Sequence, residues 1–232
     1  MWSTRYLDVM LSMCVICVVI DELISRNQCA YPSFFSGCGS AMVDLVFVLD
    51  ASTSVTAPNF ELMKKFVKDF ILEADVDGGK VKVGMVVYST ADHVEFYMND
   101  YASRAEVERA IDEIVYRQGN TNTADGIATM RDELFAGGNG ERPGVPNVAI
   151  VVTDGQSNIN RPRTIPEAEQ ARSQNIKIYA VGIGLKDTSE IDGIASKPVD
   201  EYRYQVDDFA ELDALRHKVF AALCGKGGLF LE

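Results

Sequence analysis

The sequence predicts an α/β protein with a doubly wound, mostly parallel central sheet that is flanked by helices. Four largely apolar runs, at 44–49, 81–88, 147–155 and 176–184, have the composition of strands that are buried on both faces. Between them lie segments with the 3.6-residue period of amphipathic helices. Buried strands that alternate with helices in this way form parallel sheets covered on both sides.

The first half of the chain supplies the expected elements in order. After the strand at 44–49, a helix at 60–74 carries one apolar stripe, and Pro58 suits its first turn. A weaker strand at 93–98 follows the strand at 81–88 and is assigned to an edge of the sheet. Helices are predicted at 103–115 and 123–135. The stripe of the helix at 60–74 consists of Phe60, Met63, Val67, Phe70, Ile71 and Ala74.

The second half continues the alternation. A helix at 164–174 lies between the strands at 147–155 and 176–184, and a short helix near 188–196 and a short strand near 202–206 follow. An amphipathic helix at 208–223 closes the domain. Its inward positions are Phe209, Leu212, Leu215, Val219, Phe220 and Leu223.

Composition narrows the class of partner. The 232 residues are 47% apolar and 24% charged, as in an ordinary globular domain with its own core. The formal net charge of −12 argues against a nucleic acid as partner, because an acidic surface does not replace the counterions of a phosphate backbone.

The N-terminus resembles a signal peptide. Residues 9–20 form an apolar run that is too short to span a bilayer, with Arg5 before it and acidic residues after it. The alternative is a buried helix or strand of the fold. We therefore expect a signal peptide at 1–25, a linker at 26–40, the domain at 41–224 and a tail at 225–232, in a secreted protein. No second long apolar run exists, so no membrane span is predicted.

The cysteines fit secretion. Cys14 and Cys17 lie in the apolar run and would be removed with it, which leaves Cys29, Cys38 and Cys224. If the first strand and the last helix end near each other, a Cys38–Cys224 bridge would close almost the whole domain. Cys29 would then be left to link two chains in a disulfide-bonded oligomer, unless cleavage removes it.

Oxygen-bearing side chains follow two of the predicted strands and occupy one polar loop. Asp50, Ser52 and Ser54 come directly after the strand at 44–49, and Asp154 ends the strand at 147–155. The carboxyl ends of parallel strands share one edge of the sheet, so the two carboxylates are expected to converge. Residues 119–127 add Thr121 and Thr123, either of which could also cap a helix. Such hard oxygen ligands favour Mg²⁺, Mn²⁺ or Ca²⁺ over Zn²⁺ or Cu²⁺.

These three stretches resemble the von Willebrand factor type A domain, in the extracellular form found in matrilins, collagen-associated modules and integrin inserted domains. Residues 50–54 (DASTS), Thr121 in GNTNT and residues 153–155 (TDG) match, in order, that family's metal-ion-dependent adhesion site. The resemblance covers about residues 41–224. It implies that Ser52, Ser54 and Thr121 bind a cation directly, and that Asp50 and Asp154 bind it directly or through water. Thr123 matches less well and is assigned to support of the loop or helix. Cys38 and Cys224 match the flanking disulfide of many members.

The resemblance also implies a function. The protein is expected to be an extracellular-matrix adhesion protein, with Mg²⁺, or Mn²⁺ or Ca²⁺, as cofactor. A glutamate or aspartate of a matrix protein, with collagen as the leading candidate, would complete the coordination of the cation. The alternative is a structural or scaffolding matrix protein that acts without metal.

Enzyme chemistry is not expected. The chain has two histidines, His93 on the predicted edge strand and His217 on the closing helix, and no G-x-S-x-G elbow. Val181–Gly184 lacks the third glycine of a dinucleotide-binding loop, and its glycines suit a strand end that needs small residues.

Overall fold

The computed structural model of the chain describes residues 42–227, with side chains as far as residue 223. These residues lie within one compact unit. The predicted signal peptide, linker, Cys29, Cys38, the Cys224 side chain and the end of the tail lie outside the described residues. No helix between residues 42 and 227 is long and apolar enough to cross a membrane.

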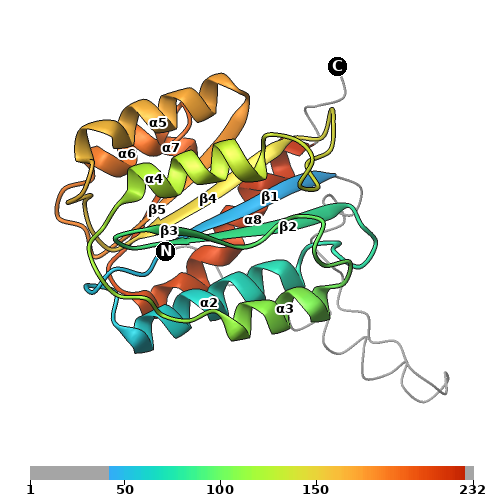
Figure 1. Cartoon of the computed structure of the whole chain (residues 1–232), viewed down its shortest axis with the longest axis horizontal. Helices are drawn as coiled ribbons and strands as arrows, with labels where there is room; N and C mark the ends of the chain where they lie inside the picture. Colours follow the sequence, from blue (N-terminus) through green and yellow to red (C-terminus); the bar gives the residue numbers. More distant parts are fainter. Residues whose placement is uncertain (1–41, 228–232) are drawn as a thin grey trace, which may run out of the picture. The chain divides into compact units, whose positions relative to one another are not determined.

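A six-stranded sheet forms the middle layer, in the order β3-β2-β1-β4-β5-β6 (Figure 1). Every neighbouring pair is parallel except β2 and β3, which are antiparallel and joined by a short turn. This arrangement confirms the predicted fold class and the edge position of β3. The strands are β1 (Val43–Asp50), β2 (Val81–Tyr88), β3 (Asp92–Phe96), β4 (Asn147–Thr153), β5 (Ile176–Ile183) and β6 (Arg203–Val206).

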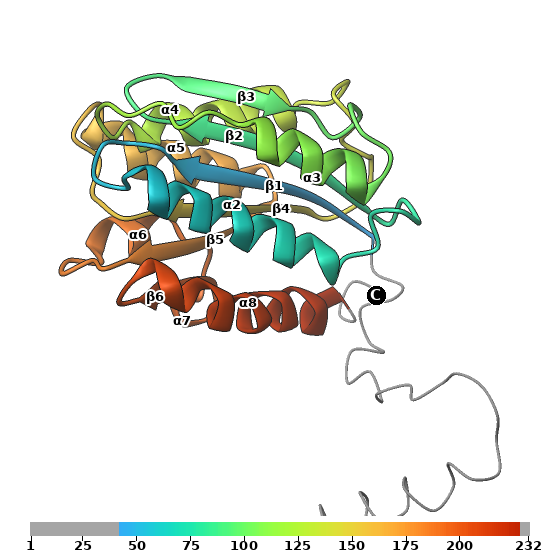
Figure 2. The ribbon, with the colours of Figure 1, turned by 90° about the horizontal axis from the view of Figure 1, so that it is seen from below.

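Helices cover both faces of the sheet. One face carries α2, α3 and α8, and Figure 2 shows α2 and α8 side by side; the other carries α4, α5 and α6. The helices are α2 (Ala57–Leu72), α3 (Arg104–Glu113), α4 (Thr123–Thr129), the π-helical turn η1 (Met130–Leu134), α5 (Arg161–Ser173), α6 (Ser189–Ile194), α7 (Val199–Tyr202), the 3-10 turn η2 (Phe209–Glu211) and α8 (Leu212–Gly227).

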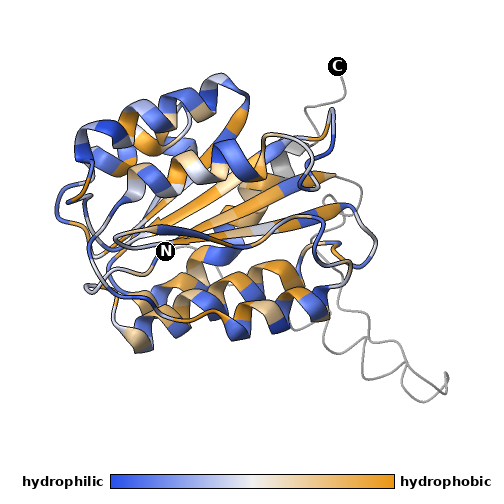
Figure 3. Ribbon diagram, in the orientation of Figure 1, coloured by the Kyte–Doolittle hydropathy of each residue, from blue (hydrophilic) through white to orange (hydrophobic). Residues whose placement is uncertain are grey.

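The core lies between the sheet and the helices. Every residue of β1 is buried, and the central strands are mostly apolar whereas the helices alternate apolar and polar faces (Figure 3). Phe70 of α2 joins the layers, because its ring lies 5.5 Å from that of Phe47 in β1 and 5.3 Å from that of Phe220 in α8. The stripes predicted for α2 and α8 therefore face the core, with Ala74 and Phe209 at its margin.

Arg142 joins the amino-terminal end of β1 to the residues directly before β2. Arg142 donates from its main-chain N and its Nε to the two carboxylate oxygens of Asp44, at 2.6 and 2.7 Å. Its Nη atoms donate to the carbonyls of Val43, Gly79 and Lys80 at 2.7–2.9 Å. Asp44 is fully buried in β1, so Arg142 provides the counter-charge that its position requires.

Several boundaries differ from the predicted ones, among them those of α2 and α8, and two of the differences have clear local reasons. Strand β4 ends at Thr153, where the N–H of Gly155 donates back to the Thr153 hydroxyl at 3.2 Å and the chain turns off the sheet. Helix α5 begins at Arg161 rather than residue 164: Asn160 adopts a left-handed conformation, φ 53°, and its carbonyl accepts from Arg163 N at 2.7 Å.

The helix predicted at 123–135 changes character after Thr129. The N–H of Phe135 donates to the carbonyl of Met130 at 3.2 Å, a five-residue step that widens the last turn into a π-helix. Arg131 lies in this turn, and its buried guanidinium binds Asp132 of the same turn and Glu167 of α5. The Arg131 side chain is therefore part of the contact between η1 and α5.

Candidate metal centre

Strand order reverses between β1 and β4, and open α/β sheets bind ligands at the carboxyl ends of the strands on either side of such a point. Three connections meet there: the β1–α2 loop (51–56), the α3–α4 loop (114–122) and the β4–α5 loop (154–160). They lie at the left edge of the sheet in Figure 1. The predicted oxygen-bearing residues occupy these loops and the end of β1.

Asp50 is the fully buried last residue of β1. Its Oδ1 accepts from Ser52 N at 2.8 Å, and its Oδ2 accepts from the Thr153 hydroxyl at 2.7 Å. Burial raises the pKa of the Asp50 carboxyl to about 6; the bonds from Ser52 and Thr153 oppose that rise and the charge of Asp154 adds to it. Among residues 42–223, no positive side chain bonds the buried Asp50 carboxylate, so a cation suits it as a counter-charge.

Hydrogen bonds connect the serines of the β1–α2 loop with Asp154 of the β4–α5 loop. The Ser52 and Ser54 Oγ atoms are 3.1 Å apart, and Ser54 Oγ donates to Asp154 Oδ1 at 2.8 Å. Burial raises the pKa of the Asp154 carboxyl, and the bond from Ser54 opposes the rise. Ser54 is exposed and Ser52 is buried, so this row of oxygens runs from the interior to the solvent.

The loop that carries Thr121 is joined to the loop that carries Asp154 by main-chain hydrogen bonds. The N–H of Thr121 donates to Asn158 Oδ1 at 2.9 Å, and its carbonyl accepts from the N–H groups of Asn158 and Ile159 at 3.0 and 3.2 Å. The structure places Thr121 beside the loop that carries Asp154. Thr123 lies deeper, with its hydroxyl 3.4 Å from that of Tyr88 in the core, which fits the supporting role assigned to it.

Neither threonine caps the following helix. The N-cap of α4 is Asn122, whose side chain accepts from Asp125 N at 3.4 Å. The cap at Asn122 leaves the hydroxyl of Thr121 outside the helix start, so the alternative of a threonine cap is wrong for both positions.

The donor set fits a hard divalent cation. It consists of two carboxylates and three hydroxyls, and the described residues contain no group of three or more His, Cys, Asp or Glu side chains suited to a metal. Oxygen donors with few charges are those that Mg²⁺, Mn²⁺ and Ca²⁺ accept. The desolvated carboxylate of Asp50 and the close approach of Ser52, Ser54 and Asp154 fit a cation of this kind.

Sequence reasoning missed the residues that hold the loops in place. Thr153 orients Asp50, Asn158 anchors Thr121, and Tyr116 bonds the main chain of the β1–α2 loop. Thr153 stood in the TDG match without an assigned role. The contacts of Asn158 and Tyr116 span 37 and 64 residues along the chain, so no local pattern indicated them.

Neither histidine takes part in the hydrogen bonds of this cluster within residues 42–223. His93 lies on the edge strand β3, and His217 on α8 is half exposed, with Nδ1 3.1 Å from Glu73. Between residues 42 and 223, no histidine hydrogen bonds to Ser52, Ser54 or Thr121. Gly182 lies in a crowded strand end, since a Cβ there would lie 2.5 Å from the Leu185 side chain and 2.7 Å from that of Ile191.

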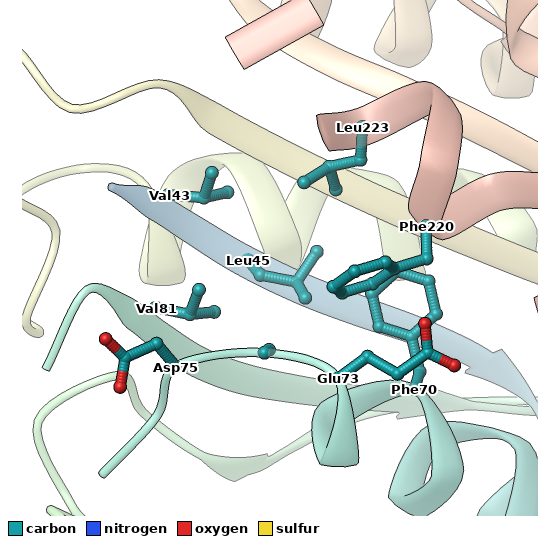
Figure 4. Close-up of a pocket in the computed structure, with 9 residues that line it drawn as sticks. Val43, Leu45, Phe70, Glu73, Asp75, Val81, Phe220 and Leu223 are labelled. Atoms are coloured by element: carbon teal, nitrogen blue, oxygen red, sulfur yellow. The ribbon is translucent and has the colours of Figure 1, made fainter. Parts of the chain in front are cut away.

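An apolar pocket lies at the opposite end of the sheet, between the first residues of β1 and β2 and the ends of α2 and α8 (Figure 4). Its lining includes Val43, Leu45, Phe70, Val81, Phe220 and Leu223. The pocket contains none of the predicted cation ligands.

The open parallel sheet and the cluster at its switch point define a class: α/β domains with an oxygen-lined ligand site at the carboxyl edge of the sheet. The family model of the von Willebrand factor type A domain matches residues 44–218. The chain belongs to the von Willebrand factor type A domain family, which confirms the resemblance found in the sequence.

Relatives of known name are similar over most of the chain. Matrilin-1 of Gallus gallus is 34% identical over 208 residues, 90% of this chain and 42% of that protein. Matrilin-4 of Homo sapiens is 33% identical and covers 82% of this chain. The collagen alpha-1(XXI) chain of Xenopus laevis is 35% identical, covering 82% of this chain and 19% of that one. The chain spans less than half the length of these relatives.

Solved structures share the fold. Proximal thread matrix protein 1 from the mussel byssus superimposes with a TM-score of 0.74 at 26% identity, over 79% of this chain and 48% of that one. Another structure of the same protein, described as having a zinc-occupied MIDAS motif, superimposes with a TM-score of 0.72 at 30% identity, over 79% of this chain and 46% of that one. The pilus adhesin SpaC from Lactobacillus rhamnosus GG, at 17% identity and a TM-score of 0.62, shows the fold alone.

Proposed function

We propose that the chain is a secreted adhesion protein of the extracellular matrix that binds a protein ligand through a divalent cation. The ligands to the cation are Asp50, Ser52, Ser54, Thr121 and Asp154. One observation carries the proposal: Ser54 Oγ lies 2.8 Å from Asp154, a hundred residues away in the chain, beside the buried carboxylate of Asp50, which bonds no cationic side chain of residues 42–223. The relatives, matrilins and a collagen chain, are matrix proteins.

The cofactor in this proposal is Mg²⁺, with Mn²⁺ and Ca²⁺ as alternatives. The hard oxygen donors support these ions, and the zinc-occupied motif of the mussel protein supports a divalent ion in general. When bound, the ion supplies a Lewis acid that accepts a carboxylate oxygen from outside the chain. Two carboxylates against a double positive charge leave little surplus negative charge to repel that group.

The partner is an acidic side chain of a matrix protein, with collagen as the leading candidate. Ser54 is exposed, so the outer side of the oxygen row is open to a ligand from solvent. The competing function, a scaffold that binds its partner without metal, differs in one respect: chelation leaves its binding intact. No enzymatic activity forms part of the proposal.

The proposed domain organisation keeps a signal peptide at 1–25, a linker at 26–40, the domain at 41–224 and a tail at 225–232, with a Cys38–Cys224 disulfide. Val43 and Leu223 line the same pocket (Figure 4), and Leu223 immediately precedes Cys224 while Cys38 lies five residues before Val43. This proximity supports the disulfide. Cys29 is then available to link two chains.

Calorimetric titration of Mg²⁺ into the metal-stripped domain tests the cation site, with Asp154→Ala as the ligand variant. Asp187→Asn is the matched control, because Asp187 is an exposed carboxylate of the neighbouring β5–α6 loop that bonds Gln156 and Ser189 but supplies no ligand. We expect saturable binding by the wild type and the control, and none by Asp154→Ala. Absence of binding by a folded wild type would overturn the proposal.

A second measurement addresses the partner. Immobilised fibrillar collagen is probed with wild type and Asp154→Ala, each with Mg²⁺ and with EDTA. Binding that EDTA and the substitution both abolish supports adhesion through the cation. Binding that survives both would replace adhesion through metal by the metal-independent scaffold.

A further inference from the structure

One phenol connects two of the loops that meet at the metal centre. The Tyr116 hydroxyl, in the α3–α4 loop, donates to the carbonyl of Ser52 at 2.8 Å, with the carbonyl of Thr53 at 3.3 Å as a second acceptor. It accepts from the N–H of Thr56 at 3.0 Å. A phenol has one proton to donate and can accept in return, so this arrangement uses both capacities.

These contacts lie on either side of Ser54 in the chain. Ser52 and Thr53 precede it and Thr56 follows it, so the Tyr116 hydroxyl holds the main chain both before and after this predicted ligand. The same loop that presents Tyr116 ends at Thr121. The hydroxyl therefore links the position of the serine ligands to that of the threonine ligand.

The segment that Tyr116 holds adopts a conformation that its sequence does not favour. Thr56 has φ 66° and ψ 153°, a region that glycine occupies and β-branched residues avoid. In that conformation its N–H points to the Tyr116 oxygen. Strain of this kind persists where surrounding contacts impose it, and the bond to Tyr116 is such a contact.

The ring of Tyr116 is itself fixed. Its centroid lies 5.5 Å from that of Phe60, a fully buried residue of α2. Two further hydrogen bonds make a second tie between the same loops. Thr53 N donates to Gly119 O and Gly119 N donates to Thr53 Oγ1, both at 2.9 Å. The hydroxyl can thus be removed while the ring packing and the second tie remain.

We propose that Tyr116 is a positioning residue for the metal centre, which sets the spacing of Ser52 and Ser54 relative to Thr121. The inference rests on the proposed function, because it concerns the affinity of that site for its ion. Mg²⁺ requires nearly ideal octahedral geometry, whereas Ca²⁺ accepts variable distances and angles. Loss of the hydroxyl therefore weakens Mg²⁺ binding more than Ca²⁺ binding.

The test compares Tyr116→Phe with wild type and with Tyr97→Phe. Tyr97 is the matched control, because its hydroxyl also forms a hydrogen bond, to Glu133 at 3.2 Å. Tyr97 lies in the β3–α3 loop and Glu133 in η1, so neither residue belongs to the site loops. Calorimetric titrations of Mg²⁺ and of Ca²⁺ give both dissociation constants for each protein. Urea denaturation in EDTA gives the stability of each without metal.

We expect Tyr116→Phe to raise the Kd for Mg²⁺ by about tenfold or more, in the range found for outer-shell partners of metal ligands, and that for Ca²⁺ by less. Tyr97→Phe leaves both constants unchanged. In metal-free protein, amide hydrogen exchange at Thr56 becomes faster in Tyr116→Phe alone, because its N–H has lost its acceptor.

The outcomes separate the two proposals. If wild type binds Mg²⁺ and Tyr116→Phe binds it equally well, or if both ions weaken equally along with a loss of stability, the hydroxyl has only a structural role and the positioning proposal is overturned. If wild type binds neither ion, the proposed function fails, and the positioning role fails with it.

Discussion

Replacement of Thr56 by glycine is expected to stabilise the metal-free domain, although substitutions to glycine usually destabilise. Thr56 precedes α2 with φ 66° and ψ 153°, and its side chain is exposed and forms no hydrogen bond with the described residues. Its N–H bond to Tyr116 is retained by any residue except proline. The substitution therefore removes backbone strain and little else.

The magnitude follows from two opposing terms. A non-glycine residue in this region of φ and ψ costs about 1–3 kcal/mol, whereas the greater freedom of glycine in the unfolded chain costs about 0.5–1 kcal/mol. The expected net gain in the free energy of unfolding is about 0–2.5 kcal/mol, centred near 1 kcal/mol. For a domain of this size, a gain of about 1 kcal/mol corresponds to a rise in Tm of roughly 2–4 °C.

Urea denaturation and calorimetric melting in EDTA measure the change without any contribution from bound metal. Ala57→Gly is the neighbouring control, because Ala57 is the exposed first residue of α2 and gains no strain relief. Its stability is expected to fall. If Thr56→Gly loses stability as Ala57→Gly does, the assignment of strain to Thr56 is wrong.

Two further predictions concern charged pairs away from the metal centre. Arg142→Met leaves Asp44 buried without its counter-charge and is expected to lower the free energy of unfolding by about 3–5 kcal/mol. A loss below about 1 kcal/mol in urea denaturation would refute the role of Arg142 as that counter-charge. Burial acts to raise the pKa of Glu167, but hydrogen bonds and charges from Arg131 and Arg163 outweigh it and lower that pKa below its ordinary value of 4.5. Ionised Glu167 therefore adds stability above its ordinary pKa, and this contribution is lost as pH falls through the lowered pKa of the folded state. Glu167→Gln should accordingly cost most stability near pH 7 and progressively less toward acid in a series of denaturation curves; a pH-independent difference would contradict this linkage.

Much of the fold was predictable because it depends on local patterns. Apolar runs without alternation indicate strands covered on both faces, and the helical stripes face the core as expected. The site residues could be proposed because ligands in open α/β sheets follow the strand ends, and Asp50, Asp154 and Thr121 lie next to such ends or in the loop beside them.

Features that depend on distant contacts escaped prediction. The helix start at Arg161 depends on a left-handed Asn160, and the π-helical turn after Thr129 accompanies the approach of Arg131 to Glu167. The cap at Asn122 could not be chosen over the neighbouring threonines, because all three residue types cap helices.

The sequence by itself determined the α/β class, the six strands, the oxygen-bearing residues proposed as cation ligands and the family, because periodicity and residue type carry that information. The tertiary structure alone decided the order of the strands, the bond from Thr153 to Asp50, the anchoring of Thr121 by Asn158 and the clamp of Tyr116 around Ser54. Each of these bonds joins residues that lie between 37 and 103 positions apart. Such pairs meet only when the sheet brings the strand ends together, so no local pattern encodes them.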